Sequence, residues 1–477
     1  MREVARTELL SRIRTENPWW SVGRIGRDFE RLKPRAYHRL LNPLVQESEV
    51  KRAVVLMGPR RVGKTVLIHH VIGDLLKREV SPRQIAYVSV DHPLYDGLTL
   101  EDLLGLYREA AAPDPDERQY VFFDEVQYLR HWEVHLKALV DQEGHGHRFL
   151  VSGSAAAALS LKSNESGAGR FTDFLLPPLT FYEFLDLTDR LDLVVLHEEG
   201  DHPAYEARDI AALNEQFVQY LNFGGYPEVV FSDAIQGDPG RFIKSDIIDK
   251  VLLRDLPSLY GISDIPELNR LFTTLAFNTA GEVSLQELAK RSGVAKNTLK
   301  KYMEYLEAAF LMRIVHRVDR SGKRFQRARR FKVYLTNPSM RAALFTPVTE
   351  NDPQVIGPLA ETAIFAQLFH SRLFEPYYAR WDRGEVDLVA LGPDQGLRWA
   401  VEVKWSDRPA DNPRDLKGLV TFCEKNRLRV ATVTTRARGG EREVGGVLIR
   451  FMPTAVCCLN IGYNIVHRQV DDVGLMR

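Results

Sequence analysis

The sequence predicts an α/β protein whose first large domain is a parallel sheet with helices on both faces. Short apolar runs alternate with amphipathic helical segments, and this alternation is typical of such sheets. The predicted strands are residues 54–57, 85–91, 121–124 and 148–154. A glycine-containing bend follows the first run, and two carboxylates end the third. Because parallel strands end at one edge of a sheet, both features are expected at that edge.

The bend after the first strand has a phosphate-binding pattern. Residues 58–65 fit G-x-x-x-x-G-K-[ST] at each fixed position. In such a loop the backbone N–H groups point into one concavity, the lysine reaches the β- and γ-phosphates, and the hydroxyl binds Mg²⁺. A chance match on a strand–helix turn is disfavoured by the flanking strand and helix. The predicted ATP-binding residues are Gly58, Pro59, Arg60, Arg61, Val62, Gly63, Lys64, Thr65 and Val66.

Two carboxylates, Asp124 and Glu125, end the third predicted strand. At that strand tip Asp124 is expected to hold Mg²⁺ together with Thr65, because the triphosphate leaves metal coordination positions open. Glu125 is expected to orient and polarise the attacking water. A surface Asp–Glu pair is the alternative interpretation. Since binding alone does not need Glu125, the pair favours an ATPase, with Lys64 and Glu125 catalytic, over a nucleotide sensor.

Length and composition limit the remaining classes. A chain of 477 residues is too long for one hydrophobic core. Its 44% hydrophobic and 27% charged residues are ordinary for a globular protein, and no apolar stretch is long enough to cross a bilayer. The first residues lack a signal-peptide core, so we expect a cytoplasmic protein without a membrane partner. Cys423, Cys457 and Cys458 suggest neither a disulfide framework nor a zinc cluster.

Residues 283–303 show two short helical patterns joined through Gly293, which is typical of a helix-turn-helix. Residues 311–318 and 331–335 read as the strands of a wing. Net charge is zero, yet residues 313–332 contain nine Lys or Arg residues and one acid. The predicted DNA-binding residues are Lys296, Asn297, Lys300, Lys301, Arg324, Arg327, Arg329 and Arg330. Backbone contacts predict weak sequence preference and steep salt dependence; a protein contact or a solvated hairpin is the alternative.

A third pattern lies near the C-terminus. Asp387 stands on one predicted strand, and Glu402 and Lys404 share one face of the next. This is the arrangement of PD-(D/E)xK nucleases, whose carboxylates bind Mg²⁺ and whose lysine orients or activates water. Glu361, on a helical segment, has the place of the additional acid in such folds. Cross-strand ion pairs are the alternative, and the fold can also serve binding without cleavage.

The runs 122–128, 152–154, 165–171 and 178–185 resemble those of prokaryotic AAA-type P-loop ATPases that carry a C-terminal domain of unknown function. The resemblance extends from the phosphate loop to about Lys404. It implies an AAA-like core that hydrolyses ATP.

Two further site residues follow from this resemblance. In AAA+ ATPases a polar group at the corresponding strand tip contacts the water or the γ-phosphate, which here is Ser152 or Ser154. Arg170 is a candidate arginine finger, which in ring ATPases comes from the adjacent subunit. A finger supplied in this way requires a homo-oligomer, and a hexameric ring is one arrangement. An ordinary loop arginine paired with Asp173 or Glu165 is the alternative.

The predicted architecture is an AAA+-like P-loop parallel-sheet core with a helical lid, a winged helix and a C-terminal restriction-endonuclease-like α/β domain. The predicted domains are an N-terminal helical extension 1–50, the ATPase core 51–190, the lid 191–265, the winged helix 266–345 and the nuclease-like domain 346–477. The predicted function is Mg²⁺-dependent ATP hydrolysis coupled to translocation, branch migration or remodelling of duplex or branched DNA. The alternatives are a nucleotide-dependent switch that gates a partner or effector nuclease, and a transcription regulator.

Overall fold

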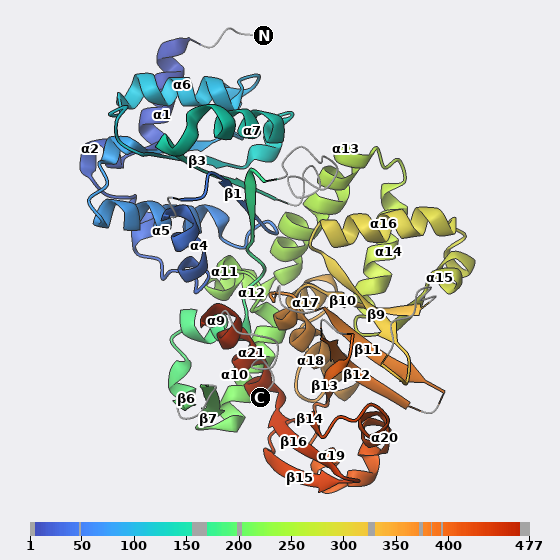
Figure 1. The fold of residues 1–477 in the computed structure, drawn as a ribbon. Coiled ribbons are helices and arrows are strands. Elements are labelled where there is room, and N and C mark those ends of the chain that lie inside the picture. The colour runs from blue at the N-terminus through green and yellow to red at the C-terminus, as the bar shows by residue number, and fades with distance from the viewer. Residues whose placement is uncertain are drawn as a thin grey trace. The chain divides into compact units, whose positions relative to one another are not determined.

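The computed structural model describes residues 5–46, 49–154, 169–197, 203–322, 330–371, 375–382, 384–392 and 395–467. These residues belong to two compact units, Met1–Pro177 and Pro178–Arg477 (Figure 1). Each unit has a large sheet of its own. Within the described ranges, no helix combines the length and the apolar character needed to cross a bilayer.

The first unit contains a five-stranded sheet in the order β2-β3-β4-β1-β5, and all of its neighbouring strands are parallel. Its strands are β1 (Ala53–Met57), β2 (Ile85–Ser89), β3 (Gln119–Asp124), β4 (His147–Gly153) and β5 (Phe171–Leu175). The apolar runs are buried because helices cover both faces. The predicted α/β class with a parallel P-loop-type core is therefore confirmed.

Helices connect these strands and also precede them in the chain. They are α1 (Arg6–Glu16), α2 (Trp19–Val22), α3 (Arg27–Glu30), α4 (His38–Gln46), α5 (Lys64–Lys77), α6 (Leu100–Ala111) and α7 (Trp132–Glu143). Leu9, Leu103 and Leu136 share one core cluster with the sheet, so α1, α6 and α7 cover the same face. Helices α4 and α5 lie on the other face (Figure 1). The first fifty residues thus build part of the first unit.

The N-terminal helices also close one edge of this sheet. Asn17 accepts a hydrogen bond from the Tyr87 N–H at 2.7 Å and donates one to the Tyr87 carbonyl at 2.8 Å, as a neighbouring strand would. The indole N–H groups of Trp19 and Trp20 both donate to the Ile85 carbonyl. Since β2 is an edge strand, these side chains satisfy backbone groups that would otherwise be open to pairing with another chain.

The second unit contains a nine-stranded mixed sheet in the order β15-β16-β14-β13-β12-β11-β9-β10-β8, and a separate hairpin β6-β7. The strands are β6 (Val194–His197), β7 (Ala204–Ala207), β8 (Glu282–Ser284), β9 (Met312–Val318), β10 (Arg330–Leu335), β11 (Pro376–Trp381), β12 (Gly384–Leu391), β13 (Leu397–Glu402), β14 (Val430–Thr435), β15 (Gly440–Val444) and β16 (Val447–Pro453).

The α-helices of the second unit are α9 (Phe181–Leu187), α10 (Ile210–Phe223), α11 (Pro227–Val230), α12 (Asp233–Gly237), α13 (Leu256–Tyr260), α14 (Ile265–Phe277), α15 (Leu285–Ser292), α16 (Lys296–Ala308), α17 (Ser339–Leu344), α18 (Pro353–Leu368), α19 (Arg408–Asp411), α20 (Lys417–Lys425) and α21 (Thr454–His467). Two π-helical segments, η7 (Gly240–Asp249) and η8 (Val251–Asp255), precede α13.

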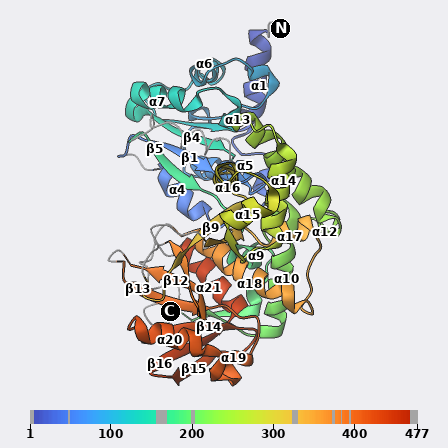
Figure 2. The same cartoon turned by 90° about the vertical axis from the view of Figure 1, so that its right-hand side faces the viewer.

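The predicted wing and the nuclease-like strands share this nine-stranded sheet. Strand β9 pairs with β10 on one side and, in parallel, with β11 on the other. Helix α20 packs against one face in a cluster that includes Val386 and Val433, while α18 and α21 lie on the other side (Figure 2). Because neighbouring residues of a strand face opposite ways, Asp387 points away from the α20 side. The three cysteines are free and buried.

Both helices predicted within 283–303 are present. Ser284 caps α15 by accepting a hydrogen bond from the Glu287 N–H, and Gly293 ends the helix at φ +75°. This left-handed conformation is one that glycine adopts at little cost. Helix α16 then buries a stripe that includes Leu299 and Leu306. The turn between the two helices therefore follows from the residues at its ends.

Candidate nucleotide site and acid–lysine cluster

The nucleotide site, defined as residues 58–65 with Asp124, Glu125 and Ser154, begins at the end of β1. A Cβ atom added at Gly58 would lie 2.1 Å from the Leu176 carbonyl oxygen. Gly63 has φ +93°, which is strained for any L side chain. Helix α5 begins at the next residue, so its N-terminus faces the concavity of the loop. The two glycines therefore have steric reasons that are independent of any ligand.

Lys64 is buried at the start of α5. Its ammonium donates to the carbonyl oxygens of Gly58 at 3.1 Å and Pro59 at 3.0 Å. Burial lowers the pKa of Lys64, although Glu125 and Asp124 act in the opposite direction. Because its hydrogen-bond partners are neutral, the ammonium can turn to an anionic ligand without breaking an ion pair.

Asp124 lies at the tip of β3 and is surrounded by neutral donors. It accepts hydrogen bonds from the hydroxyls of Thr65 at 2.7 Å, Tyr87 at 2.9 Å and Ser152, and from the Glu125 N–H at 3.1 Å. None of these partners carries a charge, so they leave its negative charge uncompensated. The hydroxyl of Thr65 and the carboxylate form a hard oxygen donor set, which fits the Mg²⁺ predicted here.

Glu125 is held by a residue that the sequence did not single out. Its backbone is left-handed, with φ +59°. The side-chain amide of Gln127 makes both contacts: its N–H donates to the Glu125 carboxylate, and its oxygen accepts from the Ser154 backbone N–H at 3.1 Å. The Ser154 hydroxyl is buried and lacks a hydrogen-bond partner among the described residues. Gln127 thus joins two predicted catalytic residues. Sequence reasoning gave it no role, although it lies in the run 122–128, because an amide three positions after the strand tip at Asp124 matches no catalytic motif.

Arg170 lies where the strands of the same sheet begin, at the end opposite the phosphate loop. Its carbonyl accepts from the Ala53 N–H at the start of β1, and its guanidinium pairs with Asp141 at 2.9 Å. The phosphate loop follows Met57, four residues along the strand, or about 13 Å away at the usual rise. Arg170 therefore does not belong to the nucleotide site of its own chain. Of the two partners considered from sequence, Glu165 lies outside the described residues.

The acid–lysine cluster of the second unit is formed by Glu361, Glu385, Asp387, Glu402, Lys332 and Lys404. The structure thus brings the four predicted nuclease-like residues together. Lys404 lies 2.7 Å from Glu402 and 3.3 Å from Asp387. The Val403 N–H also donates to Asp387 at 2.9 Å. These contacts place the Glu-x-Lys strand against the Asp strand, as the pattern predicted.

Lys332 lies among the acids, whereas the sequence placed it in a basic run and on a predicted wing strand. Its ammonium is 2.9 Å from Glu361, 2.7 Å from Glu385 and 3.6 Å from Asp387. The side chain is 5% exposed. A lysine inside the apolar run Phe331–Leu335 was a signal for this burial, because a buried ammonium requires partners.

Burial and mutual repulsion shift the pKa values in the acid–lysine cluster. Burial, with repulsion from Asp387, raises the pKa of Glu361 to about 7 and that of Glu402 to about 8. Burial also acts to raise the pKa of Asp387, but Lys404 and Lys332 outweigh it and hold that pKa below its usual value. The carboxylates outweigh the effect of burial on Lys332 and raise its pKa. The two lysines therefore remain charged, with Asp387 as their ionised partner.

This arrangement does not suit the predicted metal ion. Glu361, Asp387 and Glu402 were expected to surround Mg²⁺, but an ammonium contacts two of these three acids. Within the described ranges, no group of three or more His, Cys, Asp or Glu side chains is arranged to hold a metal ion. The difference arises because Lys332 reaches the acids from β10, a strand outside the predicted nuclease-like domain.

The predicted DNA-binding residues divide into three groups. Lys296, Asn297, Lys300 and Lys301 are exposed on α16. Arg324, Arg327 and Arg329 lie outside the described residues. Arg330 is paired with Glu282 at 3.2 Å and Glu287 at 3.0 Å.

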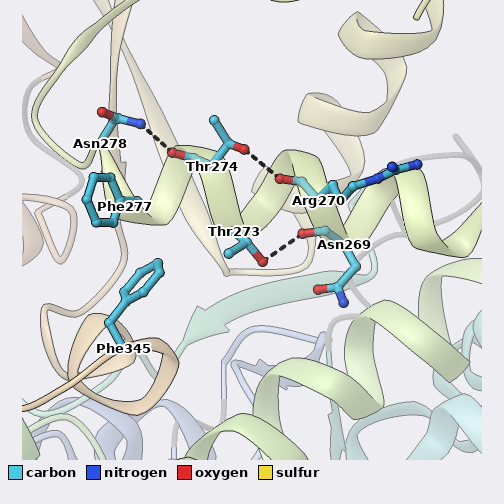
Figure 3. A pocket seen from close by; sticks show the side chains of 7 residues that line it. All are labelled: Asn269, Arg270, Thr273, Thr274, Phe277, Asn278 and Phe345. Carbon is cyan, nitrogen blue, oxygen red and sulfur yellow. Dashed lines mark hydrogen bonds between the residues drawn. The ribbon is translucent and has the colours of Figure 1, made fainter. Parts of the chain in front are cut away.

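A separate open hollow of about 430 Å³ lies along α14 (Figure 3). Phe277 and Phe345 form its apolar end. The hydroxyls of Thr273 and Thr274 and the amide of Asn278 bond to carbonyls of their own helix. These groups are therefore engaged within α14, and the hollow lacks the convergent polar groups of a built ligand site.

Two segments of the chain match known protein families. Residues 50–185 match a family described as an AAA domain, and residues 214–352 match a domain of unknown function, DUF8612. The first match contains the nucleotide site, so this part of the first unit is similar to AAA domains. The second spans the predicted boundary between lid and winged helix.

Curated relatives include two uncharacterized proteins. One, from Haemophilus influenzae, is 24% identical over 385 residues, which cover 79% of this chain and 89% of the relative. The other, MJ1637 of Methanocaldococcus jannaschii, is 24% identical over 366 residues, covering 73% and 74%.

Similar solved structures include Aeropyrum pernix Orc1 in complex with DNA, at 13% identity and a TM-score of 0.29, covering 70% of this chain and 93% of that one. The replication initiator DnaA bound to AMPPCP and single-stranded DNA has 15% identity and a TM-score of 0.27, covering 57% and 87%. At these identities and TM-scores the likenesses carry no weight for function.

Proposed function

We propose that the protein is a Mg²⁺-dependent ATPase that binds DNA and couples hydrolysis to its translocation, branch migration or remodelling. The observation that carries the ATPase part is the convergence of Lys64, Thr65, Asp124 and Glu125 at one edge of a parallel sheet. The match to an AAA domain over the same residues supports it.

Each residue of the nucleotide site has a distinct role in this proposal. Lys64 turns from the Gly58 and Pro59 carbonyls to the β- and γ-phosphates. Thr65 and Asp124 hold Mg²⁺, which when bound neutralises charge that develops on the phosphates. Glu125 orients the attacking water, and Ser154 directs its unpartnered hydroxyl toward the water or the γ-phosphate.

A steady-state assay tests the ATPase and its coupling to DNA. We expect wild-type turnover to require Mg²⁺ and to rise with duplex, single-stranded or junction DNA. The matched control is Lys64→Ala, which removes the phosphate contact and should abolish turnover in all conditions. Slow turnover that no DNA stimulates would instead support the nucleotide-dependent switch. The Gln127 hydrogen bond that holds the Glu125 carboxylate favours this alternative.

The proposal includes a homo-oligomer in which Arg170 acts on the neighbouring copy. Its place at the opposite sheet edge from its own phosphate loop favours action in trans. Arg170→Ala should lower kcat by about 10³-fold while the oligomer stays assembled. Asp141→Asn is the control, because it breaks the same ion pair and keeps the arginine. If assembled Arg170→Ala hydrolyses ATP normally, the shared site is wrong.

The DNA contact is proposed for the exposed basic side chains of α16. The pair of Lys300 with Glu304 is exposed, at 3.6 Å, and such pairs contribute little stability, so Lys300 can turn to a phosphate. Changing Lys296, Lys300 and Lys301 together to Gln should reduce the salt slope of DNA binding by roughly 1 for each lost contact. Arg414→Gln, Lys417→Gln and Lys425→Gln together, at and just before α20, remove the same number of exposed charges and control for net charge. An unchanged slope in the α16 variant would remove this surface from the proposal.

A further inference from the structure

The acid–lysine cluster contains a cation of its own. The Lys332 ammonium has three N–H donors and lies near three carboxylates, those of Glu361, Glu385 and Asp387. Glu361 also accepts from the Tyr334 hydroxyl at 2.6 Å. Since Lys332 and Tyr334 are two apart on β10, they face the same side of the sheet. One strand thus supplies both groups that hold the Glu361 carboxylate.

Asp387 and one oxygen of Glu402 are paired in a similar way, while the other oxygen of Glu402 is buried without a hydrogen-bond partner among the described residues. One oxygen of Asp387 accepts from the Val403 N–H and lies near Lys404, and the other lies near Lys332. Glu402 pairs with Lys404 at 2.7 Å. Divalent ions bind carboxylate oxygens at about 2.0–2.6 Å. A metal between Glu361 and Asp387 would therefore have to displace the Lys332 ammonium.

Such a displacement is unfavourable for two reasons. The Lys332 side chain is almost fully buried, so an ammonium separated from its acids would keep its charge in a site of low polarity. Lys332 also comes from a strand of the sheet, so its Cα is fixed by pairing with β9 and β8. The side chain cannot leave the cluster by the movement of a loop.

We propose that the Lys332 ammonium takes the place of the divalent cation in the acid–lysine cluster. The nuclease-like sheet then binds no metal at these acids and does not cleave nucleic acid through them. The cluster instead connects β10 to α18 and β12. Strand β10, which is one of the two predicted wing strands, is thereby fixed to the nuclease-like strands of the same sheet. This inference concerns the second unit alone, and loss of ATPase activity would leave it standing.

Mn²⁺ binding to the full chain tests the proposal. The background is Asp124→Asn without nucleotide, which removes the carboxylate proposed to hold Mg²⁺ in the nucleotide site, and bound Mn²⁺ is measured by electron paramagnetic resonance. We expect Glu361→Gln to leave Mn²⁺ binding unchanged, because the wild-type cluster holds none. If Glu361→Gln removes a bound Mn²⁺ from this background, the proposal is overturned.

Lys332→Met in the same background gives the converse measurement. Without the ammonium, the buried acids should gain a Mn²⁺ site, and Mn²⁺ should raise the unfolding midpoint by an amount that grows with its concentration. Adding Glu361→Gln should abolish this gain. A folded Lys332→Met chain that gains no Mn²⁺ would contradict the proposal. If Lys332→Met does not fold, Mn²⁺ binding with and without Glu361→Gln still tests the proposal.

A cleavage assay tests whether these acids support metal-dependent nuclease activity. The full chain is incubated with Mg²⁺ or Mn²⁺ and linear, branched, supercoiled and single-stranded DNA. We expect no cleavage of any substrate. Cleavage that Lys404→Ala abolishes would overturn the proposal.

Discussion

The nucleotide site and the acid–lysine cluster contain the same residue types but pair their charges differently. Both place carboxylates and a buried lysine at the tips or faces of strands. In the nucleotide site, Lys64 bonds to neutral carbonyls and Asp124 accepts from neutral hydroxyls and an N–H. In the acid–lysine cluster, Lys332 and Lys404 contact the carboxylates directly. Opposite charges that are not paired with one another remain available to an ionic ligand, whereas paired charges serve the fold.

The largest effect that separates the two regions is expected at Glu125. Glu125→Gln keeps the shape of the side chain and removes the carboxylate that polarises water. It should lower kcat for ATP hydrolysis by about 10²–10⁴-fold with nucleotide binding retained. Single-turnover hydrolysis and equilibrium binding of ATP measure the two quantities separately. Glu402→Gln is the matched change in the acid–lysine cluster and should leave ATP turnover unchanged.

The second effect is on stability, and it should differ in sign between the two lysines. Lys332→Met leaves buried acids without their cation and should lower the free energy of unfolding of the second unit by about 3–5 kcal/mol. Lys64→Met removes a buried charge that has only neutral hydrogen-bond partners, so the nucleotide-free first unit should be as stable or more stable. Amide hydrogen exchange reports on each unit separately. Equal losses of stability in both variants would contradict the expected difference between Lys332 and Lys64.

The third effect is a pH dependence of stability that arises in the acid–lysine cluster. Glu402 has a pKa of about 8 in the fold against 4.5 for a free glutamate, because it is buried near Asp387. The folded state thus holds a proton that the unfolded chain releases, so this contribution to stability is full below about pH 4.5. It should be lost as the pH rises to about 8. Urea titrations across this range should show a steeper decline for wild type than for Glu402→Gln.

The smallest effect concerns the neutral partners of Asp124. Tyr87→Phe removes one hydroxyl donor at 2.9 Å and leaves the ring in place. The cost should be about 1 kcal/mol in nucleotide-free stability, because one buried hydrogen bond is lost. Thermal unfolding with and without Mg²⁺-ATP measures it, and Tyr95→Phe, which loses its bond to Glu16, is the control away from the site. A loss of several kcal/mol would mean that Asp124 depends on this hydroxyl as strongly as the acids depend on Lys332.

Local sequence patterns were sufficient to predict the groups that lie next to one another along a strand or a loop. The phosphate loop, the Asp124–Glu125 tip and the two helices around Gly293 are confirmed as local structures because periodicity and turn residues specify them. The partners supplied from elsewhere were missed. Gln127 carries no motif, Asn17 acts as a strand neighbour of β2 from 70 positions away, and Lys332 appeared to belong to a solvated run.

The sequence by itself determined the elements and the chemistry available at their ends: a parallel sheet, a phosphate-binding turn, and acids and a lysine on facing strands. Only the tertiary structure decided how the charges are paired. Arg170 lies at the edge away from its own phosphate loop, and Lys332 reaches acids on α18 and β12. The reason is physical, since charges act through space over a few ångströms, and contacts between distant segments are set by strand order and helix packing.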